Sequence, residues 1–455
     1  SDRENQTVRL LTHKEFQLPE EALKEFTEKT GIEVLVFLEE DATSMVNLLE
    51  RSSDNPVADV VLGIDSLERR RVTEKRLVES YQPIAIDRLD PSLVLQDAML
   101  TPVSQLAACL NHSKSRYELP KRAVDELPDQ GSIPLQAPTK ISDMVKRQHA
   151  ETAVIPDPLS SRLGIYFLVA LERLHPEGVE GVTPWPKLLD EMLRWGLEVA
   201  PSWEEAWFSR FQPSAGPEST ETRSLTWGSS GMPSVSVRFI PELPEEVDVA
   251  VVDSGCIKVV NYAGIISNTP NRRDAGRLVD SFVEPLFQYG LPDRYGSRPA
   301  RTDILKTEAW RRFGVDVTAI PIDEWRIGPL WQQWLLTWKQ VADTVASGEE
   351  PDEAAMQTLM ASINSRYYDQ SPIEQGFDNA IVSGFDIDVS GLTMKMDKAE
   401  TIVKRNSEGA ATKIISPKST IVIGAGNEEN SLGAMVGEQL GKLGYDSLTM
   451  TMGGD

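Results

Sequence analysis

Basic surface is what this chain most clearly lacks. Its 455 residues include 46 Lys and Arg against 70 Asp and Glu, which gives a formal net charge of -24. No stripe of Lys or Arg is visible along the sequence. Neutralising nucleic-acid phosphates requires clustered cations, so we expect no nucleic-acid partner. An acidic surface suits solubility and can equally attract cationic ligands.

Long apolar runs are also missing. No stretch of about 18 or more apolar residues occurs, so we expect no transmembrane segment. The chain opens on the polar residues 1–5 instead of an apolar leader. This opening fits a mature chain whose signal has been removed, and it equally fits a protein that never carried one.

Cysteine and histidine are scarce, with two and four residues respectively. Cys109 and Cys256 both lie in apolar runs, so one disulfide and two buried free thiols are both compatible with the sequence. The four histidines are scattered and show no metal-ligand spacing. Neither a Ser-His-Asp order nor a G-x-S-x-G motif is present. We therefore expect no metal, no cofactor and no enzymatic activity.

The first 65 residues contain a regular alternation of short apolar segments and amphipathic segments. Apolar runs at 8–11, 32–37 and 60–64 predict strands, while 19–30 and 42–49 predict helices. This order is typical of a parallel α/β sheet, in which ligands bind outside the carboxyl ends of the strands. His13, Asp41 and Asp65 fall at such ends and are candidate ligand-binding residues.

The segment D-P-L-S-S-R-L-G at 157–164 is the second informative motif. A strand is expected to end at Pro158, and Ser160 and Ser161 are residue types that cap a helix. The exposed N–H groups of the next helix favour phosphate or carboxylate. Ser160, Ser161 and Gly164 are therefore candidates for an anion site, and an ordinary helix cap is the competing interpretation.

Two segments that contain tryptophan follow, W-E-E-A-W at 203–207 and L-T-W-G-S-S-G-M-P at 225–233. Aromatic faces can hold a flat cation by stacking and cation–π attraction. Trp203 and Trp227 are thus candidate walls of a site, with Ser229 and Ser230 as hydrogen-bonding groups. Burial of both tryptophans in the core is an equally good interpretation.

Taken in order, these segments resemble the thiamine-binding periplasmic proteins that supply ABC importers. The matching segments are L-L-T-H-K-E-F, E-D-A-T-S-M-V-N-L-L, A-D-V-V-L-G-I-D, the 157–164 motif and both tryptophan segments, and P-L-F-Q at 285–288. The resemblance spans about residues 7–345. It implies a two-lobed α/β solute-binding fold and a ligand-binding set of His13, Asp41, Ser44, Asp65, Ser160, Ser161, Gly164, Trp203, Trp227, Ser229, Ser230 and Tyr295.

The resemblance also implies an arrangement of domains and a function. Lobe 1 would comprise about 1–100 and 264–310, lobe 2 about 101–263, and a C-terminal helix would span 325–347. The ligand would be a small cationic or phosphorylated molecule, thiamine or its phosphates first. The partner would be an importer permease, and the location periplasmic or extracellular. The sequence departs from the family in aromatic positions: His13 stands where the family has Tyr.

Beyond 348 the composition changes, and the tail has no Trp. Period-2 apolar segments between 381 and 396 and a strand–turn–helix pattern from 420 to about 443 predict a separate α+β domain at 349–455. No family resemblance is found for this tail. The motif I-G-A-G at 423–426 alone is weak support for a nucleotide loop.

Two further functions are compatible with the sequence. An enzyme on the same two-lobed fold would use Asp41, Asp65 and His13 for acid–base chemistry on a thiamine-like molecule. A degenerate binding scaffold would instead act through its tail, by protein interaction. Turnover of a bound ligand would distinguish the enzyme from a solute-binding protein. A purified protein that retains no ligand would point to the degenerate scaffold.

Overall fold

The computed structural model describes residues 6–16, 18–117, 136–176, 179–211, 222–234, 249–292 and 296–349, and the backbone of two strands at 396–405 and 411–419. The chain divides into two compact units, residues 1–369 and 370–455. The first unit carries the candidate site. The predicted strand–turn–helix pattern from 420 and the predicted site residue Tyr295 lie outside the described residues.

A mixed 12-stranded sheet runs through the first unit, with the central order β2-β1-β3-β10-β5-β8-β6-β7. Short strands extend it, since β4 and β12 pair with β10 while β9 and β11 pair with β5. The strands are β1 (Gln6–His13), β2 (Ile32–Glu39), β3 (Val60–Asp65), β4 (Val78–Glu79), β5 (Thr101–Ser113), β6 (Ala153–Pro156), β7 (Glu198–Ala200), β8 (Leu225–Ser229), β9 (Val249–Val251), β10 (Ser254–Ile266), β11 (Arg298–Pro299) and β12 (Thr318–Pro321).

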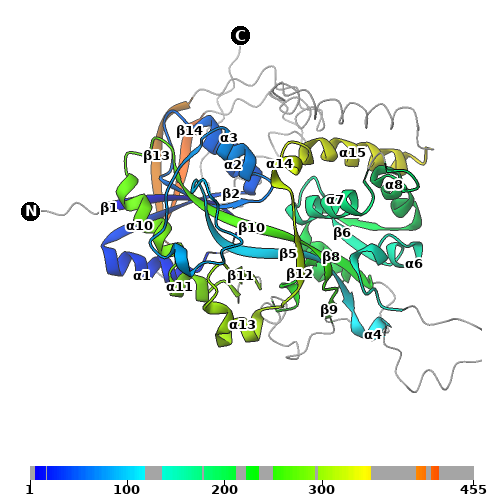
Figure 1. Ribbon diagram of the computed structural model, residues 1–455. Helices are drawn as coiled ribbons and strands as arrows, with labels where there is room; N and C mark the ends of the chain where they lie inside the picture. Colours follow the sequence, from blue (N-terminus) through cyan, green and yellow to red (C-terminus); the bar gives the residue numbers. More distant parts are fainter. Residues whose placement is uncertain are drawn as a thin grey trace, which may run out of the picture. The chain divides into compact units, whose positions relative to one another are not determined.

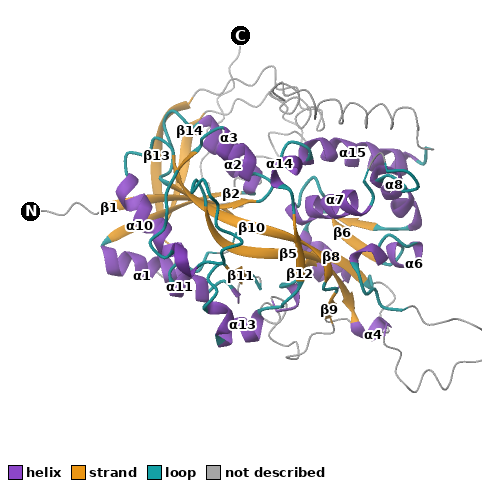
Figure 2. Cartoon of the chain, in the orientation of Figure 1, coloured by secondary structure: helices purple, strands orange, loops and turns teal. Residues whose placement is uncertain are grey.

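Helices cover both faces of this sheet, as Figure 2 shows. They are α1 (Glu20–Thr30), α2 (Ala42–Arg51), α3 (Arg69–Glu74), α4 (Lys114–Tyr117), α6 (Arg147–Ala150), α7 (Arg162–Leu174), α8 (Trp185–Trp195), α10 (Arg272–Phe282), α11 (Pro285–Tyr289), α13 (Glu308–Phe313), α14 (Glu324–Ile327) and α15 (Trp331–Ser347). The 3₁₀ turns are η1 (Ile86–Arg88), η2 (Ile141–Asp143) and η4 (Ile304–Lys306), and η3 (Glu205–Phe211) is a π-helix.

Lobe 1 is built on the strand–helix alternation that the sequence predicts. β1 pairs in parallel with both β2 and β3, so that the apolar Leu10 lies between Val36 and Val60. β3 is completely buried. α2 begins where the Asp41 side chain accepts a hydrogen bond from the Ser44 N–H, which satisfies an N–H that the helix itself cannot pair.

Two long strands, β5 and β10, connect lobe 1 to lobe 2, which contains β6, β7, β8, α7 and α8. Figure 1 shows both strands crossing the molecule between the two groups of elements. One end of β10 pairs antiparallel with β3 in lobe 1, and one end of β5 pairs antiparallel with β8 in lobe 2. Between these ends the two strands pair with each other. They therefore form the hinge of a two-lobed α/β fold.

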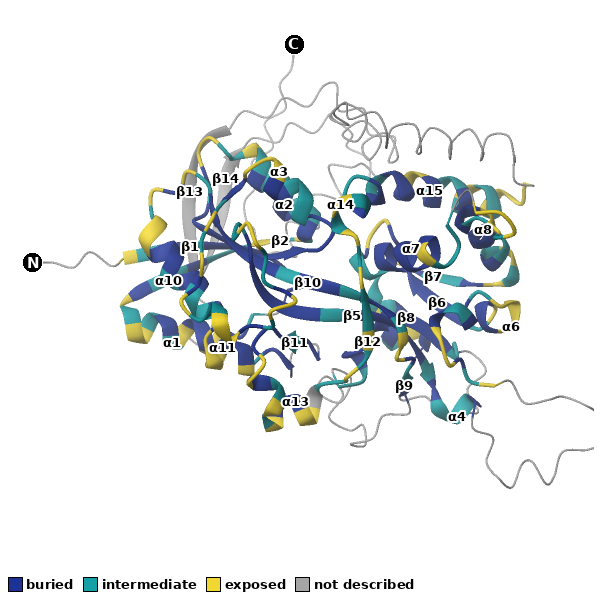
Figure 3. Ribbon diagram, viewed as in Figure 1, coloured by how far each residue is buried: buried dark blue, intermediate teal, exposed yellow. Residues whose placement is uncertain are grey.

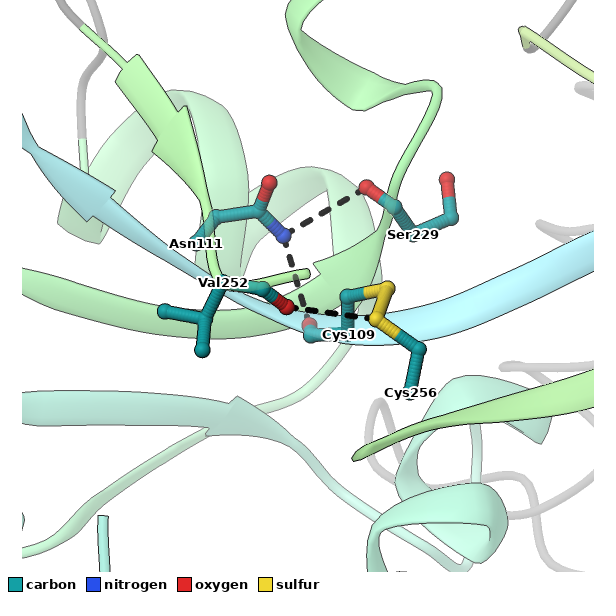
Figure 4. The surroundings of a disulfide bond; sticks show 5 residues. All are labelled: Cys109, Asn111, Ser229, Val252 and Cys256. Carbon is teal, nitrogen blue, oxygen red and sulfur yellow. Dashed lines mark hydrogen bonds between the residues drawn. A yellow bond between two sulfur atoms is a disulfide. The ribbon is translucent and has the colours of Figure 1, made fainter. Parts of the chain in front are cut away.

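A disulfide joins these two hinge strands. Cys109 of β5 and Cys256 of β10 are bonded, with 4.6 Å between their Cα atoms and 147 residues between them in sequence. Both side chains are fully buried. Figure 4 shows the bond beside Asn111, whose amide donates to the carbonyl oxygens of Cys109 and Ser229. The structure thus decides the choice between thiols and disulfide that the sequence leaves open.

Two helical segments are divided by a proline. The amphipathic segment 274–289, whose composition predicts one helix, is divided between α10 and α11, because Pro285 begins α11 at a position where its missing N–H costs nothing. The expected helix at 325–347 is also divided, into α14 and α15, at Gly328 and Pro329. In each case the sequence contains the proline that ends one helix or begins the next.

The core is divided in the same way as the lobes. Buried side chains form separate clusters on the lobe 1 strands and around α7, α8 and α15, and Figure 3 shows the buried strands beneath partly exposed helices. The rings of Trp334 in α15 and Trp185 in α8 lie 6.1 Å apart, which places α15 on lobe 2. No helix among the described residues is long and apolar enough to span a membrane.

The second unit contributes one described element, an antiparallel hairpin. Its strands are β13 (Met396–Arg405) and β14 (Ala411–Ser419), with Ile402 opposite Ile414. The predicted period-2 segments at 381–395 lie outside the described residues.

Candidate ligand-binding site

A cavity of about 110 Å³ lies between the two lobes. A water molecule needs roughly 10–15 Å³ on this measure, so the space suits a small organic molecule or several waters. Lobe 1, lobe 2 and the hinge strands all contribute to its lining, which consists of His13, Glu15, Phe16, Ala42, Asp65, Leu106, Arg162, Leu163, Tyr166, Trp203, Ser229, Met232, Val259, Asn261, Leu291 and Ser297. Half of these side chains are apolar, and they provide most of the exposed surface of the cavity.

His13 is held at the end of β1 by the backbone of β3. Its Nε2 lies 3.1 Å from the Gly63 carbonyl oxygen. Burial lowers the pKa of His13 to about 4, although the hydrogen bond to Gly63 acts in the opposite direction. The ring is therefore neutral near pH 7, with the proton on Nε2. Nδ1 has no hydrogen-bond partner among the described residues and is an acceptor.

Gly63 makes this position of His13 possible. Its φ of +101° favours glycine, and a Cβ there would lie 2.7 Å from His13 Nε2. We expect Gly63→Ala to lower the unfolding free energy by about 1–3 kcal/mol, because it adds backbone strain and displaces the ring. Urea unfolding measures the loss, and the NMR titration of His13 reports the displacement.

Gly31→Ala is the matched control for that variant. Gly31 also has a positive φ, of +70°, but no atom lies within 4 Å of the position that a Cβ would take there. The control therefore has the energetic cost of alanine at a positive φ but no clash between its Cβ and a neighbouring side chain. Equal losses in the two variants, with the His13 titration unchanged, would contradict a role for Gly63 in placing the imidazole.

Glu15 is a carboxylate in this cavity that makes no hydrogen bond or ion pair with the described residues. Burial raises the pKa of Glu15 to about 7, against the lowering effect of Arg162. The nearby carboxylates of Asp41 and Asp65 raise the pKa further. An unpaired carboxylate among apolar walls is costly to ionise. A cation placed beside it would remove that cost.

Asp65, by contrast, has every acceptor position filled. Arg162 donates to it through Nε at 2.7 Å and through Nη2 at 2.9 Å. The Tyr166 hydroxyl donates to the same carboxylate at 2.9 Å, and so do the backbone N–H groups of Leu67 and Glu68. Asp65 therefore lines the cavity as part of an ion pair between the lobes.

Four of the predicted site residues line the cavity, namely His13, Asp65, Trp203 and Ser229. Trp203 is half-buried, and its ring packs against Phe208 at 6.2 Å. Asp41 does not line it, but its charge acts on both His13 and Glu15. Its side chain caps α2 through the Ser44 N–H.

The other predicted residues that the structure describes lie outside the cavity lining. The Ser160 hydroxyl donates to the Pro201 carbonyl, and the backbone N–H of Ser230 donates to Ala107. Gly164 allows α7 to approach β6, since a Cβ there would lie 2.5 Å from the Pro156 oxygen. Ser161 is buried at the start of α7.

Trp227 belongs to the core of lobe 2. It is 1% exposed, its indole N–H donates to the Leu163 carbonyl at 2.9 Å, and its ring packs edge-on against Phe167. Trp227 is therefore a core residue, whereas Trp203 forms part of the cavity wall.

Sequence reasoning missed five polar residues of the cavity lining: Glu15, Arg162, Tyr166, Asn261 and Ser297. Arg162 carried a usable signal, because a cation in the first turn of a helix is unfavourable next to the positive end of the dipole. Such a residue points to an acidic partner elsewhere in the fold. Tyr166 follows it by one helical turn and so lies on the same face.

No protein-family model and no curated protein sequence matches this chain. Solved structures do match. A periplasmic thiamin binding protein superposes with a TM-score of 0.57 at 16% identity, over 75% of this chain and 98% of that one. The apo ferric ion-binding protein A of Pasteurella haemolytica gives 0.56 at 17% identity, over 74% and 98%.

A third structure, the spermidine/putrescine ABC transporter substrate-binding protein PotD of Streptococcus pneumoniae, gives a TM-score of 0.51 at 12% identity, over 74% of this chain and 99% of that one. These similarities confirm the fold class: the first unit has the two-lobed architecture of periplasmic binding proteins. The three named proteins bind different ligands by their titles, so the fold alone leaves the ligand open.

Proposed function

We propose that this chain is an extracytoplasmic solute-binding protein that holds a small organic cation between its lobes and delivers it to an ABC importer. The observation that carries this proposal is Glu15, a carboxylate without a hydrogen bond or ion pair to the described residues, inside a cavity whose surface is mostly apolar. The hinge strands β5 and β10 would allow the lobes to open for the ligand and close around it.

The surroundings of Glu15 favour an organic cation over a metal ion. Among the described residues, no group of three or more His, Cys, Asp or Glu could hold a metal. Phe16, Leu163 and Trp203 offer apolar and aromatic surface instead. Neutral His13 can accept a hydrogen bond from a donor group on the ligand. Thiamine, with a charged ring and an amino group, is therefore the first ligand to test.

The site favours the unphosphorylated molecule. Glu15 and Asp65 would repel phosphate, and the hydroxyl of Ser160, predicted for an anion site, is engaged by Pro201. Arg162 is the one Lys or Arg among the described residues that line the cavity, and it already has two carboxylate partners. We therefore expect thiamine diphosphate to bind more weakly than thiamine.

Titration calorimetry on refolded protein tests the proposal, because refolding removes any ligand that was retained. Glu15 is expected to become fully ionised when a cation binds, so affinity should be greatest above its pKa of about 7. Below that value, affinity for thiamine should fall by up to about tenfold per pH unit. In Glu15→Gln the affinity at pH 8 should drop by about 30-fold or more, and this pH dependence should disappear.

Two controls separate a lost site from a lost fold. Glu20→Gln removes an exposed charge from α1 and should leave binding unchanged. Ligand-free Glu15→Gln should be at least as stable as the parent at pH 8. The pKa of Glu15 is higher in the folded than in the unfolded chain, so its ionisation costs the parent stability as pH rises towards 7.

Three outcomes would count against the proposal. The first is no heat with thiamine at any pH between 6 and 8. The second is parent-like affinity in Glu15→Gln. The third is tighter binding of thiamine diphosphate than of thiamine, which would show an anion site where the structure has carboxylates.

A further inference from the structure

Arg162 occupies an unusual position for a charged side chain. It lies in the first turn of α7 in lobe 2, and its side chain is only 9% exposed. Burial alone would lower the pKa of Arg162, but the carboxylates of Asp65 and Glu68 raise it above its ordinary value. The guanidinium is therefore charged and almost completely removed from water.

Among the described residues, every hydrogen bond of this guanidinium crosses from lobe 2 to lobe 1. It is bidentate to Asp65 at the end of β3, donates to Thr43 at the start of α2 at 2.9 Å, and lies 3.3 Å from a Glu68 carboxylate oxygen. One face of it lies 4.8 Å from the ring centroid of Trp331. Two carboxylates and an aromatic face are what a binding site offers to an organic cation.

We propose that Arg162 is an internal cation that takes the place of a ligand between the lobes and holds them closed in the absence of solute. The solute then binds in the remaining cavity beside Glu15, which has no ion-pair partner among the described residues. This inference rests on the proposed function, because closure matters for a protein that captures a solute between its lobes.

The chemistry of the contact explains why arginine would serve and lysine would not. The planar guanidinium matches a carboxylate with two parallel hydrogen bonds and can also stack on an indole ring. Removing one member of a buried charge pair leaves the other without compensation. Without Arg162, Asp65 and Glu68 would repel each other across the lobe 1 wall, and water would enter between the lobes.

Pulsed electron–electron resonance tests the inference on the full chain, with spin labels at Lys24→Cys in α1 and Gln148→Cys in α6. Both positions are exposed, one on each lobe. Without solute, the parent should give a single short-distance population. Arg162→Ala should shift the distribution to longer distances, and millimolar ethylguanidinium should restore the short one. Ethylammonium, which lacks the planar fork, should restore it less.

Arg9→Ala is the matched control. Arg9 makes a similar bidentate contact with Asp59, through Nε at 3.1 Å and Nη2 at 2.7 Å, but both residues belong to lobe 1. It should destabilise the protein without changing the interlobe distance. Unchanged distances in Arg162→Ala, or equal shifts in both variants, would overturn the inference.

The interlobe distance of the parent without solute tests the inference even if Arg162→Ala does not fold. A parent that is open without solute would overturn the inference, and a closed one would support it. None of these measurements needs a bound solute. If the proposal for Arg162 fails, that result can therefore be distinguished from a failure of the protein to bind thiamine.

Discussion

Replacing Asp65 with Asn is expected to lower the unfolding free energy by about 3–5 kcal/mol. The carboxylate accepts hydrogen bonds from Arg162, Tyr166 and two backbone N–H groups, and its side chain is 5% exposed. An amide keeps the shape but presents an NH₂ group towards donors. The charge of Arg162 would then remain buried with Glu68 as its one remaining acidic partner among the described residues of lobe 1.

Urea unfolding followed by circular dichroism measures this loss. Asp343→Asn is the control, because its pair with Lys339 joins two exposed residues of α15, and exposed pairs contribute at most about 1 kcal/mol. A loss in Asp65→Asn no larger than that of the control would mean that the buried pair contributes little to the fold.

Replacing both Cys109 and Cys256 with Ser should lower the unfolding free energy by about 2–5 kcal/mol. The bond closes a loop with a sequence separation of 147 residues, for which loop entropy alone gives about 5 kcal/mol. The bond also holds the lobe 2 end of β5 against β10, since Cys109 lies opposite Gly228 of β8 and both cysteines belong to the core cluster around α7 and α8. Its loss would therefore loosen the lobe 2 end of the hinge strands as well as lower the unfolding free energy.

Chemical reduction provides the control for this variant. The parent unfolded in the presence of dithiothreitol should match the double Ser variant, and the variant itself should not respond to the reductant. If the oxidised parent and the variant unfold at the same urea concentration, the disulfide makes no contribution to stability.

Local patterns were sufficient to predict the first three strands and their helices. The period of the apolar residues and the cap at Asp41 are encoded within each segment, so the parallel order of β1, β2 and β3 follows from nearby residues. For the same reason, the convergence of His13 and Asp65 at strand ends was predictable. Both line the cavity.

Contacts between distant segments were not predictable in this way. The Cys109–Cys256 bond depends on the register of β5 against β10, and two cysteines in apolar runs do not reveal it. The partner of Arg162 lies 97 residues away in sequence. The aromatic residues show the same limit, since the sequence around Trp203 and Trp227 favours neither the wall nor the core interpretation, and only the first lines the cavity.

Because β10 is a central strand, the sheet cannot be completed until β10 has been synthesised. β10 covers one edge of β3, and the paired residues Val60 and Ile265 are separated by roughly 200 residues, which a ribosome needs about 10–40 s to add at ~5–20 residues per second. During that interval β3 presents a largely apolar, unpaired edge of the kind that recruits strands from other chains. A chaperone that keeps the nascent chain extended until residue 266 has been made would therefore protect this topology from aggregation.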